Sequence, residues 1–110
     1  MVRGETQKRL DIGRIRQINQ QTGAFLTLHG GSRTADQDFV AAIQAGITII
    51  HVNTELRLAW RQGVEEGLNA HPNEIAPYKI LPAAVNAVEA IVARRLRLFN
   101  NLPQAPAAAA

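Results

Sequence analysis

The chain has 110 residues, 46% of them hydrophobic and 19% charged, a composition typical of one folded domain or a piece of a larger one. A net charge of only +3 with 5% aromatic residues argues against a nucleic-acid partner, and the absence of cysteine excludes disulfides, thiolate metal sites and cysteine nucleophiles. No apolar run approaches the roughly 20 residues that span a bilayer, and the first ten residues lack the apolar stretch of a signal peptide, so we expect no membrane partner. The absence of cysteine fits the cytoplasmic location that we expect.

The first predicted elements are a helix and a short strand. From Asp11 to Gln21 an isoleucine recurs every third residue, which marks one face of a helix with Asp11 as its N-cap. Gly23 follows at the position where helices often end in the left-handed conformation. Residues 24–29, AFLTLH, then predict a strand that is apolar on both faces, as buried parallel strands are.

A glycine-rich loop leads from this strand to a second helix and a second strand. The loop GGSRT occupies residues 30–34, and the helix after it carries two aspartates in its first turn and ends at Gly46. Residues 47–53, ITIIHVN, predict a β-branched strand that is again apolar on both faces. Strand, helix and strand within about 30 residues form a right-handed βαβ unit, so we predict that the two strands are parallel.

A longer helix is predicted from Thr54 to about Asn69, because its apolar residues recur at helical spacing. The stripe that we predict to be core consists of Leu56, Ala59, Trp60, Val64 and Leu68. The charged residues predicted to lie outside it are Glu55, Arg57, Arg61 and Glu65.

A final helix is predicted from Pro77 to about Phe99, after a turn at HPNE. Its predicted stripe consists of Ile80, Leu81, Ala84, Val88, Ile91, Val92 and Leu96. Arginines in its last turns, Arg94, Arg95 and Arg97, are predicted to form a solvated or subunit-contact face. Residues 102–110 are rich in proline and alanine and are predicted to be a disordered tail.

The two strands cannot make a complete sheet by themselves. Strands that are apolar on both faces need neighbours at both edges and cover on both faces, because unpaired edges aggregate. The sequence contains no further strand. We therefore expect this α/β chain to be part of a larger sheet.

Two polar segments follow the two predicted strands, where parallel sheets place their ligands. They are His29-Gly30-Gly31-Ser32 and His51-Val52-Asn53-Thr54. The backbone N–H groups of a glycine-rich segment can approach an anion, and a helix start is a second anion-binding position, so a phosphate would suit this rim. The alternative is that GGS is a tight turn and Thr54 an ordinary helix cap.

The histidines of these segments are weak evidence for a metal site. A single histidine at a strand end is more often a hydrogen-bonded structural residue than a metal ligand. His29 and His51 could both approach one ion, but two ligands are too few for tight zinc binding. His71, beside Pro72 in the HPNE turn, is predicted to be solvated.

Three segments, LTLHGGS, AIQAGITIIHVNTELRLAW and APYKILPAAVNAV, resemble the C-terminal part of the class II, metal-dependent ketose-bisphosphate aldolases. The fructose-1,6- and tagatose-1,6-bisphosphate enzymes are the nearest members. The resemblance runs from about Leu10 to Asn101, so we assign residues 1–101 to the C-terminal part of such an enzyme. It implies a (β/α)8 barrel, of which this chain would supply the last two strands with their flanking and C-terminal helices.

The resemblance also implies an activity in carbohydrate metabolism, as in glycolysis, and roles for the rim residues. Family members use zinc (Zn²⁺) to cleave a ketose bisphosphate to dihydroxyacetone phosphate and an aldehyde. His29 would be one of three zinc-binding histidines. The residues expected to bind the sugar-phosphate substrate are Gly30, Gly31, Ser32, His51, Val52, Asn53 and Thr54.

Some residues depart from the family pattern. His51 stands where the family usually has asparagine, Ile49 where it often has lysine, and Arg33 where it commonly has glycine. Arg33 could tighten phosphate binding or obstruct the loop. The other two zinc histidines and the acid/base aspartate belong to earlier strands that the sequence does not contain, so no catalytic residue is assigned.

We therefore expect the chain to be inactive alone, and either to form a homo-oligomer or to associate with the rest of the barrel. The alternative is a non-catalytic phosphate-binding or structural α/β module that acts with a partner chain.

Overall fold

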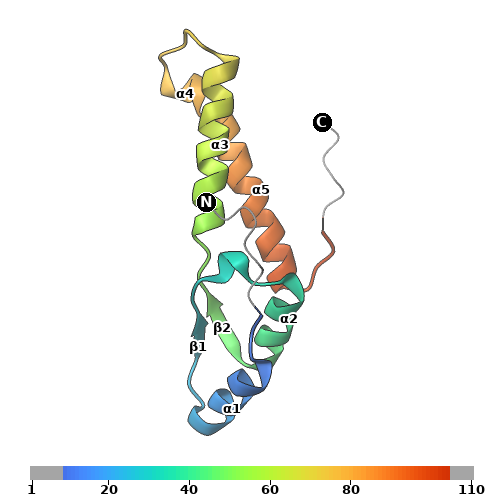
Figure 1. Cartoon of the computed structure of the whole chain (residues 1–110). Helices are drawn as coiled ribbons and strands as arrows, with labels where there is room; N and C mark the ends of the chain where they lie inside the picture. The colour runs from blue at the N-terminus through green and yellow to red at the C-terminus, as the bar shows by residue number, and fades with distance from the viewer. Residues whose placement is uncertain (1–8, 105–110) are drawn as a thin grey trace. The chain divides into compact units, whose positions relative to one another are not determined.

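The computed structural model of the chain describes residues 9–104, which form two compact units (Figure 1). Residues 9–53 and 98–103 belong to the first unit, and residues 54–97 and 104 to the second.

The first unit contains a βαβ arrangement preceded by a helix. Its elements are α1 (Ile12–Thr22), β1 (Leu26–Leu28), the short 3-10 helix η1 (Gly31–Arg33), α2 (Asp36–Ala45) and β2 (Ile47–Ile50). The two strands pair in parallel, which confirms the predicted βαβ unit. A register irregularity lies at the start of the pairing, between Leu26 and Thr27.

The ends of the first two helices follow the sequence signals. The Asp11 side chain accepts a hydrogen bond from the backbone N–H of Arg14 at 3.0 Å, and Gly23 ends α1 with a φ of 63°. Gly46 ends α2, also at positive φ. The strands are shorter than predicted, because β1 covers only three residues and β2 only four.

The two faces of this small sheet differ in burial. On one face Ile47 is buried and Leu28 and Ile50 are half-buried, and α2 packs against β2. On the opposite face Phe25 and Ile49 are 85% and 46% exposed. The described residues therefore cover one face of the sheet and leave the other face exposed, although both faces were predicted to need cover.

The core of the first unit centres on Phe39 of α2. Its side chain is fully buried and lies against Phe99, with ring centroids 5.1 Å apart. A polar contact also involves α2, since the buried Asp38 carboxylate accepts hydrogen bonds from the Arg9 guanidinium at 2.9 and 3.1 Å and from the Leu10 N–H at 2.9 Å. These bonds fasten the segment before α1 to the first turn of α2.

The second unit consists of helices α3 (Thr54–Ala70), α4 (Pro77–Ile80) and α5 (Pro82–Phe99) as far as Arg97, with the predicted turn between α3 and α4. The prediction of one helix from Pro77 to Phe99 is wrong. Proline has no backbone N–H to donate and its ring clashes with the preceding turn, so the chain breaks at Pro82 and a new helix begins there.

The buried face of α3 is formed by small residues, and this corrects the predicted core. Ala59, Gly63 and Gly67 are buried, whereas Trp60 and Leu68 are 53% and 49% exposed. A Cβ at Gly63 would collide with the backbone of Ala84 in α5, and one at Gly67 would collide with the carbonyl of Ile80 in α4. The helices therefore approach through the glycines, and the large side chains lie beside this contact.

Two charged residues of this unit, Glu55 and Arg95, also depart from the prediction. Arg95 is 7% exposed and its guanidinium binds the carboxylate of Glu55, so neither residue lies on a solvated face. Val92 and Leu96, predicted to be core, are 40% and 57% exposed. The buried residues of α5 are Ala84 and Arg95, so several of its valine and leucine side chains remain exposed.

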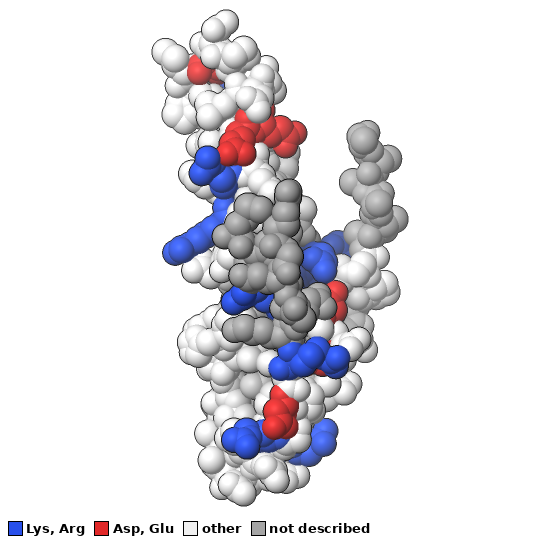
Figure 2. Space-filling view, viewed as in Figure 1, with Lys and Arg blue, Asp and Glu red and all other residues white. Residues whose placement is uncertain are grey.

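Elsewhere on the surface, acidic and basic side chains are interspersed on the face drawn in Figure 2. One such pair joins Arg61 to Glu65 in α3 at 2.8 Å. Among the described residues no helix is long and apolar enough to cross a membrane. Most of the predicted tail, residues 105–110, lies outside the described residues, and Leu102–Gln104 follow α5 without regular structure.

Candidate functional site

The candidate site lies in the first unit, at the carboxyl ends of the two parallel strands. His29 directly follows β1 and His51 directly follows β2. The His51 N–H donates to the carbonyl of Leu28 at 2.9 Å, so the parallel pairing continues for one bond past the strand ends. The two polar segments predicted from the sequence therefore begin side by side on one rim.

The two histidine rings are in direct contact. Their Nδ1 atoms lie 3.1 Å apart, their centroids are 4.5 Å apart, and the ring planes meet at 82°. Both side chains are exposed, as are Thr27 and Ile49 on the same face of the sheet. Alternation along the strands thus places the imidazoles on the face that α2 does not cover.

The GGS segment is tied to the second strand by a backbone hydrogen bond. Gly30 has a φ of 68°, which turns the chain, and the buried Gly31 donates its N–H to the carbonyl of His51 at 3.2 Å. A Cβ at Gly31 would lie 3.1 Å from that carbonyl and 3.3 Å from Phe39. Position 31 therefore favours glycine because the loop packs closely on both β2 and α2.

This bond changes what Gly31 can contribute to a ligand. Its N–H already has a backbone acceptor, so its part in the site is to bring the loop close to the strand. Gly30 is exposed, and Ser32 and Arg33 are half-buried and engaged in contacts of their own. The sequence showed a tight loop here but gave no sign of the partner of the Gly31 N–H.

The remaining predicted residues lie at the end of the first unit and the start of the second. Val52 is half-buried and Asn53 is exposed, and both belong to the first unit. Thr54 is the first residue of α3 and belongs to the second unit. The structure therefore brings together the segments that begin with His29 and His51.

The metal-binding capacity of this rim is limited to two imidazoles. Within residues 9–104 no three histidine or carboxylate side chains gather as a metal site. The third histidine, His71, is exposed in the turn after α3, as predicted. A neutral imidazole nitrogen is a good ligand for zinc, so the histidine pair is the chemically competent part of the rim.

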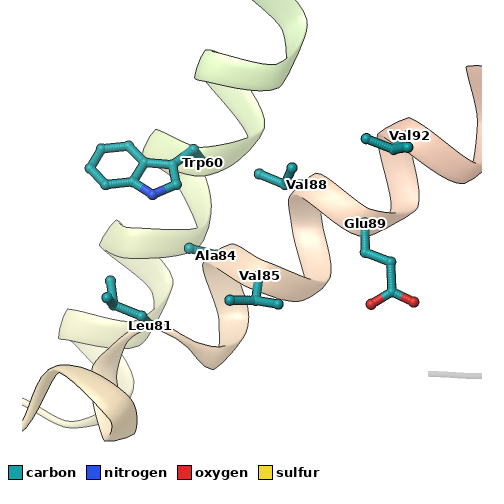
Figure 3. Close-up of a pocket in the computed structure, with 7 residues that line it drawn as sticks. All are labelled: Trp60, Leu81, Ala84, Val85, Val88, Glu89 and Val92. Atoms are coloured by element: carbon teal, nitrogen blue, oxygen red, sulfur yellow. The ribbon is translucent and has the colours of Figure 1, made fainter.

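A concave surface lies in the second unit and is almost entirely apolar. Figure 3 shows Trp60 of α3 above a row of side chains from α5, with Leu81 at one end. The groove is lined by Trp60, Leu81, Ala84, Val85, Val88, Glu89 and Val92. Because Glu89 is its only ionisable side chain, it lacks the convergent polar groups of a catalytic site.

Comparisons with known proteins concern nearly the whole chain. The model of the family described as fructose-bisphosphate aldolase class-II matches residues 1–103. A sulfofructosephosphate aldolase of Alkalicoccus urumqiensis is 36% identical over 92 residues, which are 84% of this chain and 32% of that protein.

Two further relatives match in the same way. A probable fructose-bisphosphate aldolase of Bacillus subtilis is 34% identical, over 87% of this chain and 34% of its own length. A fructose-bisphosphate aldolase of Geobacillus stearothermophilus is 33% identical, over 84% of this chain and 32% of its own length. The chain thus spans about a third of the length of the curated relatives that it matches.

Proposed function

The chain belongs to the class II fructose-bisphosphate aldolase family, and from this we propose that it supplies the last two strands of a (β/α)8 barrel together with part of its zinc and substrate site. The observation that carries the proposal is the position of His29, at the carboxyl end of β1 and beside the glycine-rich loop, where barrel enzymes carry their chemistry. In this assignment residues 1–101 are the part of the chain that belongs to the barrel.

The exposed face of the sheet supports the barrel. In such a barrel the helices cover the outside and side chains from all strands fill the interior. Here α2 packs on one face, and the other face leaves Phe25 and Ile49 exposed and carries both histidines. That face is the one that would point into the barrel, with His29 and His51 at its rim.

His29 is the proposed metal ligand contributed by this chain. A zinc ion held there would supply Lewis acidity toward the substrate carbonyl. His29 holds one coordination position, and the resemblance assigns the other two histidines and the proton-transferring aspartate to earlier strands. The proposal therefore predicts no turnover by the 110-residue chain alone.

The glycine-rich loop and the segment after β2 are the proposed substrate-binding residues. The exposed Gly30, the Ser32 hydroxyl and the start of α3 at Thr54 would bind the phosphate of the dihydroxyacetone phosphate portion. Gly31 would hold this loop against β2 through its bond to His51. His51, Val52 and Asn53 would line the path of the sugar.

The proposed substrate is a ketose bisphosphate, cleaved reversibly to dihydroxyacetone phosphate and an aldehyde. The names of the relatives from Bacillus and Geobacillus favour fructose bisphosphate, and the Alkalicoccus relative is named for a sulfofructose phosphate. The partner required is the remaining part of a barrel, or a further copy of the chain in an oligomer. We place the enzyme in the cytoplasm, where sugar phosphates are metabolised.

The second candidate is a non-catalytic module that acts with a partner chain. The hydrogen bond from the Gly31 N–H to the His51 carbonyl favours this candidate, because it gives the loop a structural role that needs no ligand. This candidate keeps the barrel-like contacts and the phosphate loop but predicts no turnover in any assembly.

A chimera tests the two candidates. The part of the Geobacillus stearothermophilus aldolase that precedes its match to this chain is joined to residue 10, and the release of dihydroxyacetone phosphate from fructose-1,6-bisphosphate is measured with zinc. The aldolase proposal predicts turnover by the chimera and none by the 110-residue chain. It also predicts that His29→Ala lowers the turnover of the chimera at least about a hundredfold, because general acid–base catalysis and metal catalysis both depend on the assembled site.

His71→Ala is the matched control, because His71 is an exposed histidine away from the rim. It should leave the turnover of the chimera unchanged. A folded chimera without turnover would favour the non-catalytic module. Turnover by the 110-residue chain that disappears in His29→Ala would show that the rest of the barrel is not needed.

A further inference from the structure

We propose that His51 is a second metal ligand of this chain, so that His29 and His51 bind one divalent transition-metal ion together. The inference deepens the proposed function, on which it rests for the role of His29. The structure places the imidazole of His51 directly against His29, the proposed metal ligand.

The distance between the two nitrogens supports this pairing. Zinc–nitrogen bonds of about 2.0–2.1 Å at tetrahedral angles place two ligand nitrogens about 3.3 Å apart. The Nδ1 atoms of His29 and His51 are 3.1 Å apart, so the pair needs only a small opening to hold an ion between them. The ring planes meet at 82°, so the two imidazoles lie edge to face and do not stack on one another.

The backbone holds this arrangement in place. The His51 N–H donates to Leu28, whose next residue is His29, and the His51 carbonyl accepts from Gly31. Both Cα positions are therefore fixed by the ladder and by the loop, and only the side-chain torsions must be restrained when metal binds. Such preorganisation lowers the entropic cost of bringing two ligands to one ion.

Two ligands also limit the affinity. Catalytic zinc sites commonly have three protein ligands, and the described residues offer no third histidine or carboxylate at this rim. The 110-residue chain should therefore bind zinc reversibly and lose it on dialysis.

Zinc titration of the 110-residue chain, followed by calorimetry and by ¹⁵N NMR of the imidazoles, tests the inference without any assay of activity. We expect one equivalent of Zn²⁺ to shift the Nδ1 resonances of both His29 and His51. His51→Asn and His29→Ala should each weaken binding at least tenfold, and His71→Ala should leave it unchanged. Circular dichroism of each variant checks that the fold is retained.

The possible results separate the inference from the proposed function. If His29→Ala weakens binding but His51→Asn does not, and only the His29 resonance shifts, His51 is not a ligand while the role proposed for His29 remains. If zinc shifts neither resonance, or if no binding is detected, the paired site is wrong. In that case turnover of the chimera still decides the proposed function by itself.

Discussion

The carboxylate of Glu55, in the first turn of α3, binds the guanidinium of Arg95 in α5 through two hydrogen bonds of 2.5 and 2.7 Å. The Arg95 side chain is 9% exposed and that of Glu55 is 17% exposed, so water competes little for either charge. A bidentate pair of this kind fixes the relative rotation of the two helices as well as their separation.

Removing one member of this pair should destabilise the second unit strongly. Glu55→Ala leaves the Arg95 charge buried without its carboxylate, and we expect a cost of about 3–5 kcal/mol in the free energy of unfolding. Glu65→Ala is the matched control, since it removes the carboxylate of an exposed pair in the same helix and should cost only about 0.3–0.5 kcal/mol. Urea unfolding followed by helical circular dichroism measures both, and equal losses would contradict the prediction.

The glycines of α3 should resist substitution even though they lie within a helix. In an open helical position Gly→Ala stabilises by up to about 1 kcal/mol. At Gly63 the added methyl would meet the backbone of Ala84, which has no flexible side chain to move aside, so we expect Gly63→Ala to destabilise by about 1–3 kcal/mol.

Gly13→Ala is the comparison for this substitution. Gly13 is also helical, and its added Cβ would meet only the Asp11 carboxylate at 3.7 Å. It should stabilise the chain slightly, by about 0.5–1 kcal/mol. Thermal unfolding of the two variants should therefore shift the melting temperature in opposite directions, and a rise for both would show that α3 is not packed through Gly63.

Stability should fall in acid partly because of Asp38. The hydrogen bond from the Arg9 side chain, with the backbone N–H of Leu10, lowers the pKa of Asp38 below its ordinary value, although desolvation opposes this. A carboxyl with a lowered folded pKa stabilises the fold above its unfolded pKa of about 3.9 and loses that contribution as the pH falls through the lower folded value.

Asp38→Asn should therefore reduce stability at pH 7 and flatten the acid branch of the stability curve below about pH 5. Arg9→Gln should act in the same direction but less, because the Leu10 N–H still binds the carboxylate. Denaturant unfolding between pH 3 and pH 7 measures the effect. The prediction fails if the acid branch of Asp38→Asn coincides with that of the unchanged chain.

The purified chain should self-associate through the apolar groove of the second unit. Trp60 and Val85 are 53% and 61% exposed there, and contiguous apolar surface of this kind favours association. Val85→Glu should shift the sedimentation coefficient towards that of the monomer. Ala90→Glu places the same charge on an exposed position of α5 outside the groove and should leave association unchanged. A compact monomer at tens of micromolar would contradict the prediction.

The local signals of the sequence predicted the first unit well. Asp11, Gly23 and Gly46 have the helix-ending roles that their chemistry favours, and the βαβ spacing gave the parallel pairing. These features depend on neighbours within a few residues, or on one crossover of standard length. The positions of His29 and His51 on one rim followed from the same rule.

The second unit was harder to predict because its packing depends on residues far apart in the chain. Apolar periodicity placed Trp60 in the predicted core. The helices instead pack where Gly63 and Gly67 have no side chain, and a pattern of hydrophobic residues does not reveal such a contact. Arg95 pairs with Glu55, which lies forty positions earlier in the chain, and the cluster of arginines around Arg95 did not indicate that partner. At the rim, the Gly31 bond was missed because its acceptor is a backbone carbonyl that any residue at position 51 would provide.

That last feature gives position 51 a particular freedom for protein engineering. The loop is attached to the main chain of His51, not to its imidazole, so a set of substitutions there would change the chemistry beside His29 while the loop keeps its anchor. The effects of an amide, a carboxylate and an imidazole at position 51 could then be compared on the same backbone. Such a series would separate the effect of a ligand's identity from the effect of its placement.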